Sequence, residues 1–219
     1  MKSSGDLAAD CLELYSDACY RTSGIFTIRS KDGGARQVYC DMETDGGGWT
    51  VILKRGDGSV NFSRNWEDYK NGFGNPSTEY WIGNEMIHNL SASFLYVMIT
   101  HANGSVFYEI YDHFYVSSEA TGYKLYIGDA TGTLGNAMTP PSSLAQVHSM
   151  GFSTMDRDQD QNSSANCATL SGGGGWWYNN CHQALLTGPY ATTEWIRPWS
   201  PMFDDGTQIK AVKMMLKRK

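Results

Sequence analysis

An acidic run followed by a pair of cysteines offers the clearest possibility of chemistry in this sequence. Asp156, Asp158 and Asp160 occupy alternate positions, and Cys167 and Cys181 bracket the polar loop that follows them. Carboxylates this close together repel one another unless a cation or solvent neutralises them, and hard oxygen ligands of this kind suit calcium. The spacing alone leaves two interpretations open: a calcium site, or an acidic turn that is simply solvated.

The loop does not follow the EF-hand pattern. An EF-hand requires glycine at its sixth position and a bidentate glutamate at its twelfth. Counted from Asp156, those positions hold Gln161 and Cys167. Any calcium site here must therefore combine carboxylates with loop carbonyl groups.

Enzyme motifs fit this chain poorly. The sequence contains no G-x-S-x-G, H-E-x-x-H or P-loop motif, and the glycine run at 172–175 is not followed by Lys-Ser or Lys-Thr. Cys181 and His182 are neighbours in sequence, but neighbouring side chains rarely point toward each other as a nucleophile and its base. We therefore expect a protein that is not an enzyme.

Composition and charge narrow the class of protein. The 219 residues carry a formal net charge of −6, and 13% of them are aromatic while 18% are charged. This profile indicates a globular, loop-rich chain and argues against a nucleic-acid-binding protein, which needs a basic face. The longest purely apolar run, at 94–99, is far shorter than the roughly 20 residues that span a membrane, so we expect no membrane span.

Cysteines and glycosylation motifs indicate the compartment. Five cysteines occur and none forms a C-x-x-C pair, so their number alone does not say which of them pair. Four N-x-Ser sequons begin at Asn61, Asn89, Asn103 and Asn162. Together these features favour a secreted, glycosylated protein over a cytosolic one with reduced thiols. No signal peptide is present, so we expect the natural protein to extend upstream, with residues 1–9 as a linker remnant.

Hydrophobic patterning predicts a sheet with short helices. A helix is expected over about 7–15, and further short helices are expected between 66 and 90. Strands are expected at 25–28, 37–40, 49–53, 94–100, 107–114, 123–127 and 208–216. Regular structure thins out over 128–205, where we expect a metal and a disulfide to hold the chain. Trp176 and Trp177 are interpreted as core residues; on a strand, one would face inward and the other outward.

Five segments together resemble the fibrinogen-like, or fibrinogen C-terminal, domain family. They are 40–51 (CDMETDGGGWTV), 62–80 (FSRNWEDYKNGFGNPSTEY), 81–84 (WIGN), 152–158 (FSTMDRD) and 180–182 (NCH). The similarity covers nearly the whole chain and is closest in kind to ficolin- and tachylectin-type lectins. It implies an α+β fold with a small N-terminal subdomain, a central antiparallel sheet and a loop-rich calcium- and ligand-binding subdomain. We expect one domain over 10–219, with subdomains at about 10–55, 56–127 plus 208–217, and 128–207.

The resemblance also implies specific bonds and metal ligands. Cys11 would pair with Cys40 and Cys167 with Cys181, which leaves Cys19 over. Calcium would be bound by Asp158 and Asp160 with the backbone carbonyls of Asn162 and Ser164. The loop is one residue longer than in the family, so Ala165 is an alternative source of the second carbonyl.

A ligand pocket beside the second disulfide is the last implication of the resemblance. In lectins of the family a cis peptide precedes the second cysteine, which would be Asn180–Cys181 here, and turns backbone N–H groups toward the ligand. The expected ligand-binding residues are Tyr178, Asn180, Cys181, His182, Trp195 and Phe203, with Arg197 nearby. The sequence departs from the family after Tyr190, where a loop of about a dozen residues that supplies part of the pocket is missing.

From this resemblance we expect a secreted, calcium-dependent pattern-recognition lectin of innate immunity. Its partners would be glycans with N-acetyl or anionic groups on microbial surfaces. The alternative is a protein-binding module of the receptor-ligand or fibrin-knob type that does not bind sugar. Weak single sites would require multivalency, so we expect a homo-oligomer formed through the upstream region or through Cys19.

Overall fold

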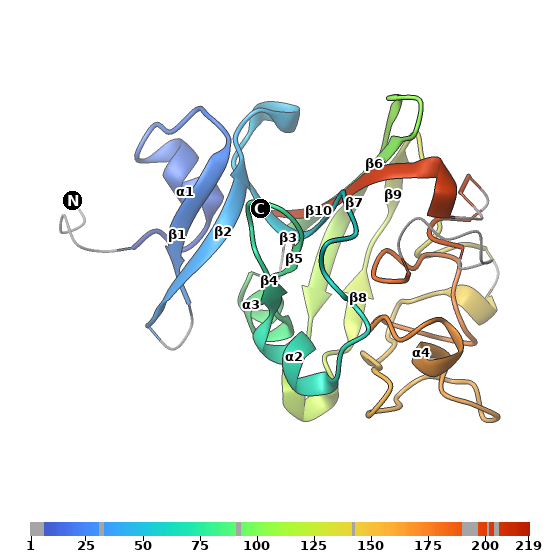
Figure 1. Ribbon diagram of the computed structural model, residues 1–219. Coiled ribbons are helices and arrows are strands. Elements are labelled where there is room, and N and C mark those ends of the chain that lie inside the picture. The colour runs from blue at the N-terminus through green and yellow to red at the C-terminus, as the bar shows by residue number, and fades with distance from the viewer. Residues whose placement is uncertain are drawn as a thin grey trace.

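A computed structural model describes residues 7–30, 33–90, 93–141, 143–189, 197–200, 202–203 and 206–219. One ten-stranded sheet runs through the described chain in the order β1-β2-β3-β10-β6-β7-β8, with β4, β5 and β9 attached beside it (Figure 1). Its strands are β1 (Gly24–Arg29), β2 (Ala35–Asp41), β3 (Trp49–Arg55), β4 (Phe73–Gly74), β5 (Tyr80–Trp81), β6 (Ser93–His101), β7 (Val106–Val116), β8 (Leu125–Ile127), β9 (Ala130–Gly132) and β10 (Ile209–Arg218). This arrangement confirms the predicted α+β fold with its antiparallel sheet.

The helices are all short. The α-helices are α1 (Cys11–Ser16), α2 (Trp66–Asn71), α3 (Asn84–Asn89) and α4 (Cys167–Leu170), and the 3-10 turns are η1 (Thr44–Gly46), η2 (Glu119–Thr121), η3 (Ser143–Ala145) and η4 (Gly206–Gln208). The predicted N-terminal helix begins later than expected, at Cys11, because the Asp10 side chain caps it by accepting from the Glu13 N–H. None of the helices among the described residues is long and apolar enough to cross a membrane.

The last strand joins the two halves of the sheet. β10 pairs antiparallel with β3 on one side and with β6 on the other, so the end of the chain lies at the centre of the sheet (Figure 1). Each predicted strand is present with small shifts at its ends. β8 begins at Leu125, two residues after the predicted start, because Tyr123 has a φ of +50°, a left-handed conformation that a strand cannot include.

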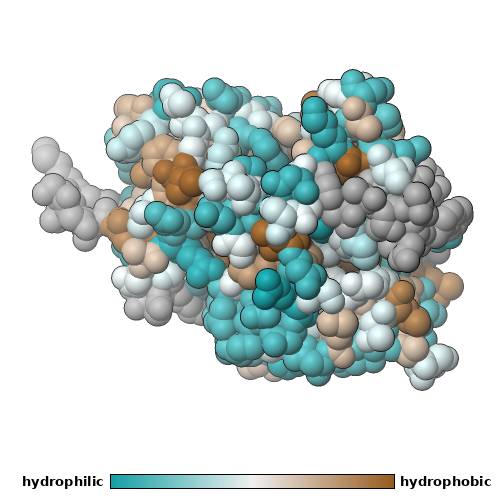
Figure 2. Space-filling model, viewed as in Figure 1, coloured by the Kyte–Doolittle hydropathy of each residue, from teal (hydrophilic) through white to brown (hydrophobic). Residues whose placement is uncertain are grey.

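An aromatic core holds the loop-rich region after β8. Trp176 and Trp177 are both fully buried, and Trp177 packs on the rings of Phe152 and Trp81. The interpretation of both tryptophans as core residues is confirmed, and the inward-outward alternation of a strand does not apply because this segment lies outside the named strands. Gly175 makes the approach possible: a Cβ there would lie 2.8 Å from ring atoms of Phe152 and Tyr69. Large apolar groups at the surface are few and scattered on the face that Figure 2 shows.

Disulfides fix the two ends of the domain. Cys11 is bonded to Cys40, and Cys167 is bonded to Cys181, which are the pairs that the resemblance implies. The first bridge fastens α1 to β2, and the second closes the loop that follows the acidic run. Cys19 is a free, exposed cysteine.

Candidate functional site

The acidic loop is wrapped around the carboxylate of Asp160. Its Oδ1 accepts from the Asn162 N–H at 2.8 Å, and its Oδ2 accepts from the Cys167 N–H at 2.7 Å. Asp158 Oδ1 in turn accepts from the Asp160 N–H at 3.2 Å. The carboxylates of Asp158 and Asp160 are therefore both bound by backbone N–H groups of the acidic loop.

The electrostatics of this loop suit a cation. Burial raises the pKa of Asp160, and the neighbouring Asp158 carboxylate raises it further, although the two N–H donors act in the opposite direction. No hydrogen bond to the carbonyl oxygens of Asn162 or Ser164 is found among the described residues. Two hard carboxylates beside two uncommitted carbonyls fit the oxygen-donor set that Ca²⁺ prefers. Within the same described residues, no three His, Cys, Asp or Glu side chains cluster to hold a metal ion, so an ion here would need the carbonyl oxygens as ligands.

Asp156 does not belong to this donor set. Its Oδ1 accepts from the Trp66 N–H at 2.9 Å and from Thr154 Oγ1 at 2.7 Å. The first aspartate of the acidic run therefore anchors the loop to the start of α2.

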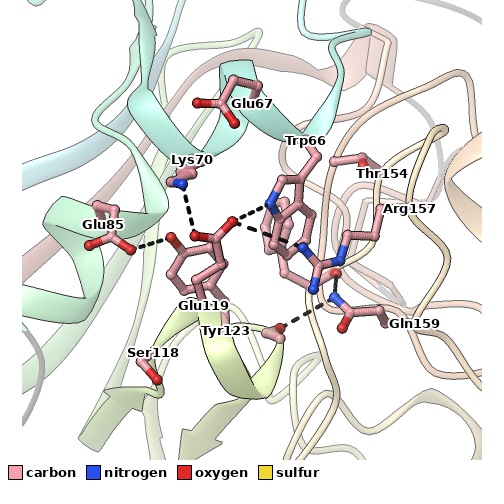
Figure 3. A network of polar contacts seen from close by, with 12 residues as sticks. Trp66, Glu67, Lys70, Glu85, Ser118, Glu119, Tyr123, Thr154, Arg157 and Gln159 are labelled. Atoms are coloured by element: carbon pink, nitrogen blue, oxygen red, sulfur yellow. Dashed lines mark hydrogen bonds and ion pairs between the residues drawn. The ribbon is translucent and has the colours of Figure 1, made fainter.

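Next to this anchor lies a polar network that sequence analysis did not identify (Figure 3). Glu119 accepts from Trp66 Nε1 at 2.9 Å and pairs with Lys70 Nζ at 2.8 Å. The guanidinium of Arg157 lies 3.9 Å from the centre of the Trp66 ring and 3.9 Å from Glu119 Oε1. Tyr123 stacks on the Trp66 ring with the ring centres 5.4 Å apart, and its hydroxyl donates to Glu85. The network thus fixes the segment that leads into the acidic loop against α2, α3 and η2.

The acidic loop is connected directly to the second disulfide. Besides the Cys167 N–H bond to Asp160, Gln161 N–H donates to the Asn179 carbonyl at 3.1 Å, and Asn162 Nδ2 lies 3.7 Å from Cys181 Sγ. A cation that ordered the acidic loop would therefore also order the segment around Cys181, through these contacts.

A cavity of about 420 Å³ lies at that segment. It is lined by Leu144, Ala145, Asn180, Cys181, His182, Gln183 and Arg197. The Asn180–Cys181 peptide bond is cis, as the resemblance implies. The Asn180 N–H already donates to the Leu144 carbonyl at 3.0 Å, so it is not open to a ligand; those of Cys181 and His182 have no described acceptor.

His182 is held as a neutral imidazole in the cavity wall. Burial and then the charge of Arg197 lower its pKa to about 4. Its Nε2 lies 3.1 Å from Ser171 Oγ, while its buried Nδ1 has no hydrogen-bond partner among the described residues. The Ser171–His182 contact has the reach of a nucleophile and base, but the low pKa makes a weak base and no acceptor orients Nδ1 as a catalytic triad requires.

Tyr178 and Phe203, also expected to bind the ligand, are not among the described residues that line this cavity. Tyr178 is fully buried, and its hydroxyl donates to the Gly174 carbonyl at 2.5 Å. Its ring packs edge-to-face with the His182 ring. Phe203 is 2% exposed and packs on the rings of His101 and Phe107. Both rings are therefore buried in the core in this structure. Trp195 lies outside the described residues.

Known proteins similar to this chain include angiopoietin-2 and fibroleukin. Human (Homo sapiens) angiopoietin-2 is 40% identical over 185 residues, which cover 83% of this chain and 36% of angiopoietin-2. Bovine (Bos taurus) fibroleukin is 42% identical over 186 residues, covering 83% of this chain and 41% of fibroleukin. The chain thus spans well under half the length of these relatives.

Solved structures agree with this grouping. The fibrinogen-like globe domain of human ANGPTL6 superimposes with a TM-score of 0.87 at 32% identity, covering 100% of this chain and 99% of that one. Lamprey fibrin D-dimer, complexed with the peptide Gly-His-Arg-Pro-amide, superimposes with a TM-score of 0.84 at 32% identity, covering 99% of this chain and 75% of that one.

These relatives overturn the expected function. They are angiopoietins, an angiopoietin-related protein and fibroleukin, not the ficolin- and tachylectin-type lectins that the motifs were thought to resemble most. The predictions of a pattern-recognition lectin and of microbial glycans as its partners are therefore wrong, and the alternative, a protein-binding module, is favoured.

The family itself is shown by its full-length match. The profile described as fibrinogen beta and gamma chains, C-terminal globular domain, matches residues 7–218. This chain belongs to the fibrinogen C-terminal globular domain family.

Proposed function

We propose that this chain is an extracellular recognition module that binds a protein partner at the cavity beside the Cys167–Cys181 disulfide. The observation that carries the proposal is the charge of that cavity: Arg197 contributes a cation, and none of its described lining residues is a carboxylate. A cationic wall favours a neutral or acidic segment and disfavours a basic one. Two disulfides and four sequons support an extracellular location.

Peptide recognition has a precedent among the similar structures. The lamprey fibrin D-dimer carries a short basic peptide, Gly-His-Arg-Pro-amide. The cavity described here would repel such a peptide through Arg197, so we propose the same class of ligand, a protein segment, with the opposite charge preference. Apolar contacts would come from Leu144 and Ala145, and polar ones from the N–H groups of Cys181 and His182.

Ca²⁺ would hold the loop that supports this cavity. Asp158 and Asp160 with the carbonyls of Asn162 and Ser164 would bind it, and the ion would neutralise the two carboxylates. Because Gln161 and Asn162 contact the segment 179–181, an ordered loop would keep the cavity in shape. Calcium removal is therefore expected to weaken partner binding without removing any group from the cavity wall.

Binding of the labelled chain to intact animal cells tests the proposal. Mild trypsin treatment of the cells should abolish binding, while treatment with glycosidases should leave it. Arg197→Glu should reduce binding at least about tenfold, a loss of about 1.4 kcal/mol. The charge reversal Lys124→Glu, at an exposed position on another surface, serves as the matched control. Binding that survives trypsin, or an Arg197→Glu chain that binds like the natural one, would overturn the proposal.

A further inference from the structure

We propose that Asn103 carries an N-linked glycan in the folded protein and that Asn162 does not. Both begin N-x-Ser sequons, so the sequence treats them alike. The structure separates them by what surrounds each side chain. The proposal uses the extracellular route included in the proposed function, but it does not depend on the cavity or its partner.

Asn103 lies at the tip of the hairpin that joins β6 to β7. Residues 102–106 are all exposed, so the whole acceptor tripeptide is in solvent. Asn103 Oδ1 accepts from the Ser105 N–H at 2.9 Å, which leaves Nδ2 with no described partner. Around Gly104, no heavy atom comes within 4 Å of the place where a Cβ would lie. A bulky substituent on Nδ2 therefore displaces only water.

The hairpin also holds its shape without the Asn103 amide nitrogen. Gly104 N–H donates to the His101 carbonyl at 2.9 Å, and Ala102 N–H donates to the Gln208 carbonyl at 2.8 Å. These backbone bonds remain when Nδ2 is modified. The tip of the β6–β7 hairpin projects at the top of the view in Figure 1, far from α4 near the bottom. The surface of this hairpin tip is largely hydrophilic in Figure 2.

Asn162 has the opposite surroundings. Its Oδ1 accepts from the Ser164 N–H at 3.0 Å, and its Nδ2 lies 3.7 Å from Cys181 Sγ, so both ends of the carboxamide are occupied. The residue is also only partly exposed and lies within the acidic loop. A glycan on Nδ2 would separate the loop from the second disulfide, and a chain carrying one would not reach this fold.

The other two sequons lack the open setting of Asn103. Asn61 is exposed, but Phe62, the middle residue of its tripeptide, is 3% exposed and belongs to the core. Asn89 ends α3, and the serine of its tripeptide lies outside the described residues.

The chemistry requires one co-reactant, a lipid-pyrophosphate-linked oligosaccharide. A bond forms between Asn103 Nδ2 and C1 of the first sugar, and the bond from C1 to the pyrophosphate oxygen breaks. The lipid pyrophosphate leaves with the electron pair, and the amide nitrogen gives up one proton. No oxidation or reduction is involved.

Site mapping of the secreted chain tests this inference. The chain is produced in animal cells behind a secretion signal, and glycan sites are read by mass spectrometry after enzymatic removal in ¹⁸O-water. Asn103 should be labelled in most molecules and Asn162 in none. Asn103→Gln and Ser105→Ala should each lose one glycan on a gel, Ser105→Thr should keep it, and Asn162→Gln should lose none.

An unlabelled Asn103 in secreted protein, or a labelled Asn162, would overturn the inference. Cell binding is measured on the same samples. A chain that is glycosylated at Asn103 but does not bind cells would count against the proposed function alone.

Discussion

Asp156 Oδ1 accepts a hydrogen bond at 2.9 Å from the backbone N–H of Trp66, the first residue of α2. The first N–H groups of a helix have no partner inside the helix, so a carboxylate there satisfies a free donor and complements the helix dipole. The acidic run thus divides into one aspartate that anchors the loop and two that remain for a cation.

Calcium should stabilise the folded chain through Asp158. At a free concentration of 100 times the dissociation constant, binding adds about 2.7 kcal/mol to the free energy of unfolding. Asp158→Asn should lose most of this gain, whereas Asp156→Asn should lower stability by about 1 kcal/mol with and without calcium yet keep the gain. Thermal unfolding with calcium or with a chelator measures both. Equal melting temperatures for the natural chain under the two conditions would refute the calcium site.

Acid should weaken the fold through His182. Its pKa is lowered to about 4 by burial and by Arg197, so between pH 6.5 and 4 the unfolded chain binds more protons than the folded one. Stability contributed by the neutral ring is therefore complete above pH 6.5 and is lost as the pH falls through this window, by about 3 kcal/mol in total. Urea unfolding across this range should show a shallower decline for His182→Gln. The exposed His113→Gln is the control, and an identical decline in all three chains would contradict the assignment.

Gly175 should not tolerate a side chain. Because an added Cβ would meet Phe152 and Tyr69 at 2.8 Å, Gly175→Ala should destabilise the fold by about 2–3 kcal/mol through overpacking. Gly56→Ala is the matched control, since no heavy atom lies within 4 Å of its Cβ position, and it should change stability by less than about 0.5 kcal/mol. Chemical denaturation gives both values. Equal effects of the two substitutions would show that Gly175 is not a packing requirement.

Glu119 should matter chiefly through the Trp66 indole. Glu119→Ala leaves Trp66 Nε1 without its acceptor, and we expect a loss of about 1–2 kcal/mol in the free energy of unfolding. In a double-mutant cycle with Arg157→Ala, the coupling should stay within about 1 kcal/mol, because that ion pair is partly exposed and 3.9 Å long. Glu67→Ala, at an exposed position on α2 next to Trp66, should change stability little. A coupling energy larger than the stability lost in Glu119→Ala alone would mean that the ion pair with Arg157, and not the Trp66 indole, accounts for most of the effect.

Local patterns in the sequence predicted the strands β1, β2, β3, β6, β7, β8 and β10, but not the short strands β4, β5 and β9. The motif resemblance implied the family and the disulfide pairs. Strands such as β6 and β7 follow runs of apolar and aromatic residues separated by Asn103-Gly104, a turn signal that acts within a few residues. The cysteine pairs followed from motifs shared by the whole family. Those motifs indicated the family but gave the wrong kind of ligand, since the similar proteins are angiopoietins and fibroleukin.

Tertiary structure alone decided how the site residues are used. Asp156 looks identical to its two neighbours in the sequence, yet its partner Trp66 lies 90 residues away. The resemblance implies that Tyr178 and Phe203 bind the ligand, but the structure buries both side chains in the core. The Asn180 N–H, expected to face a ligand, is taken by Leu144. These outcomes depend on which segments pack together, and a buried polar group accepts whichever partner that packing provides.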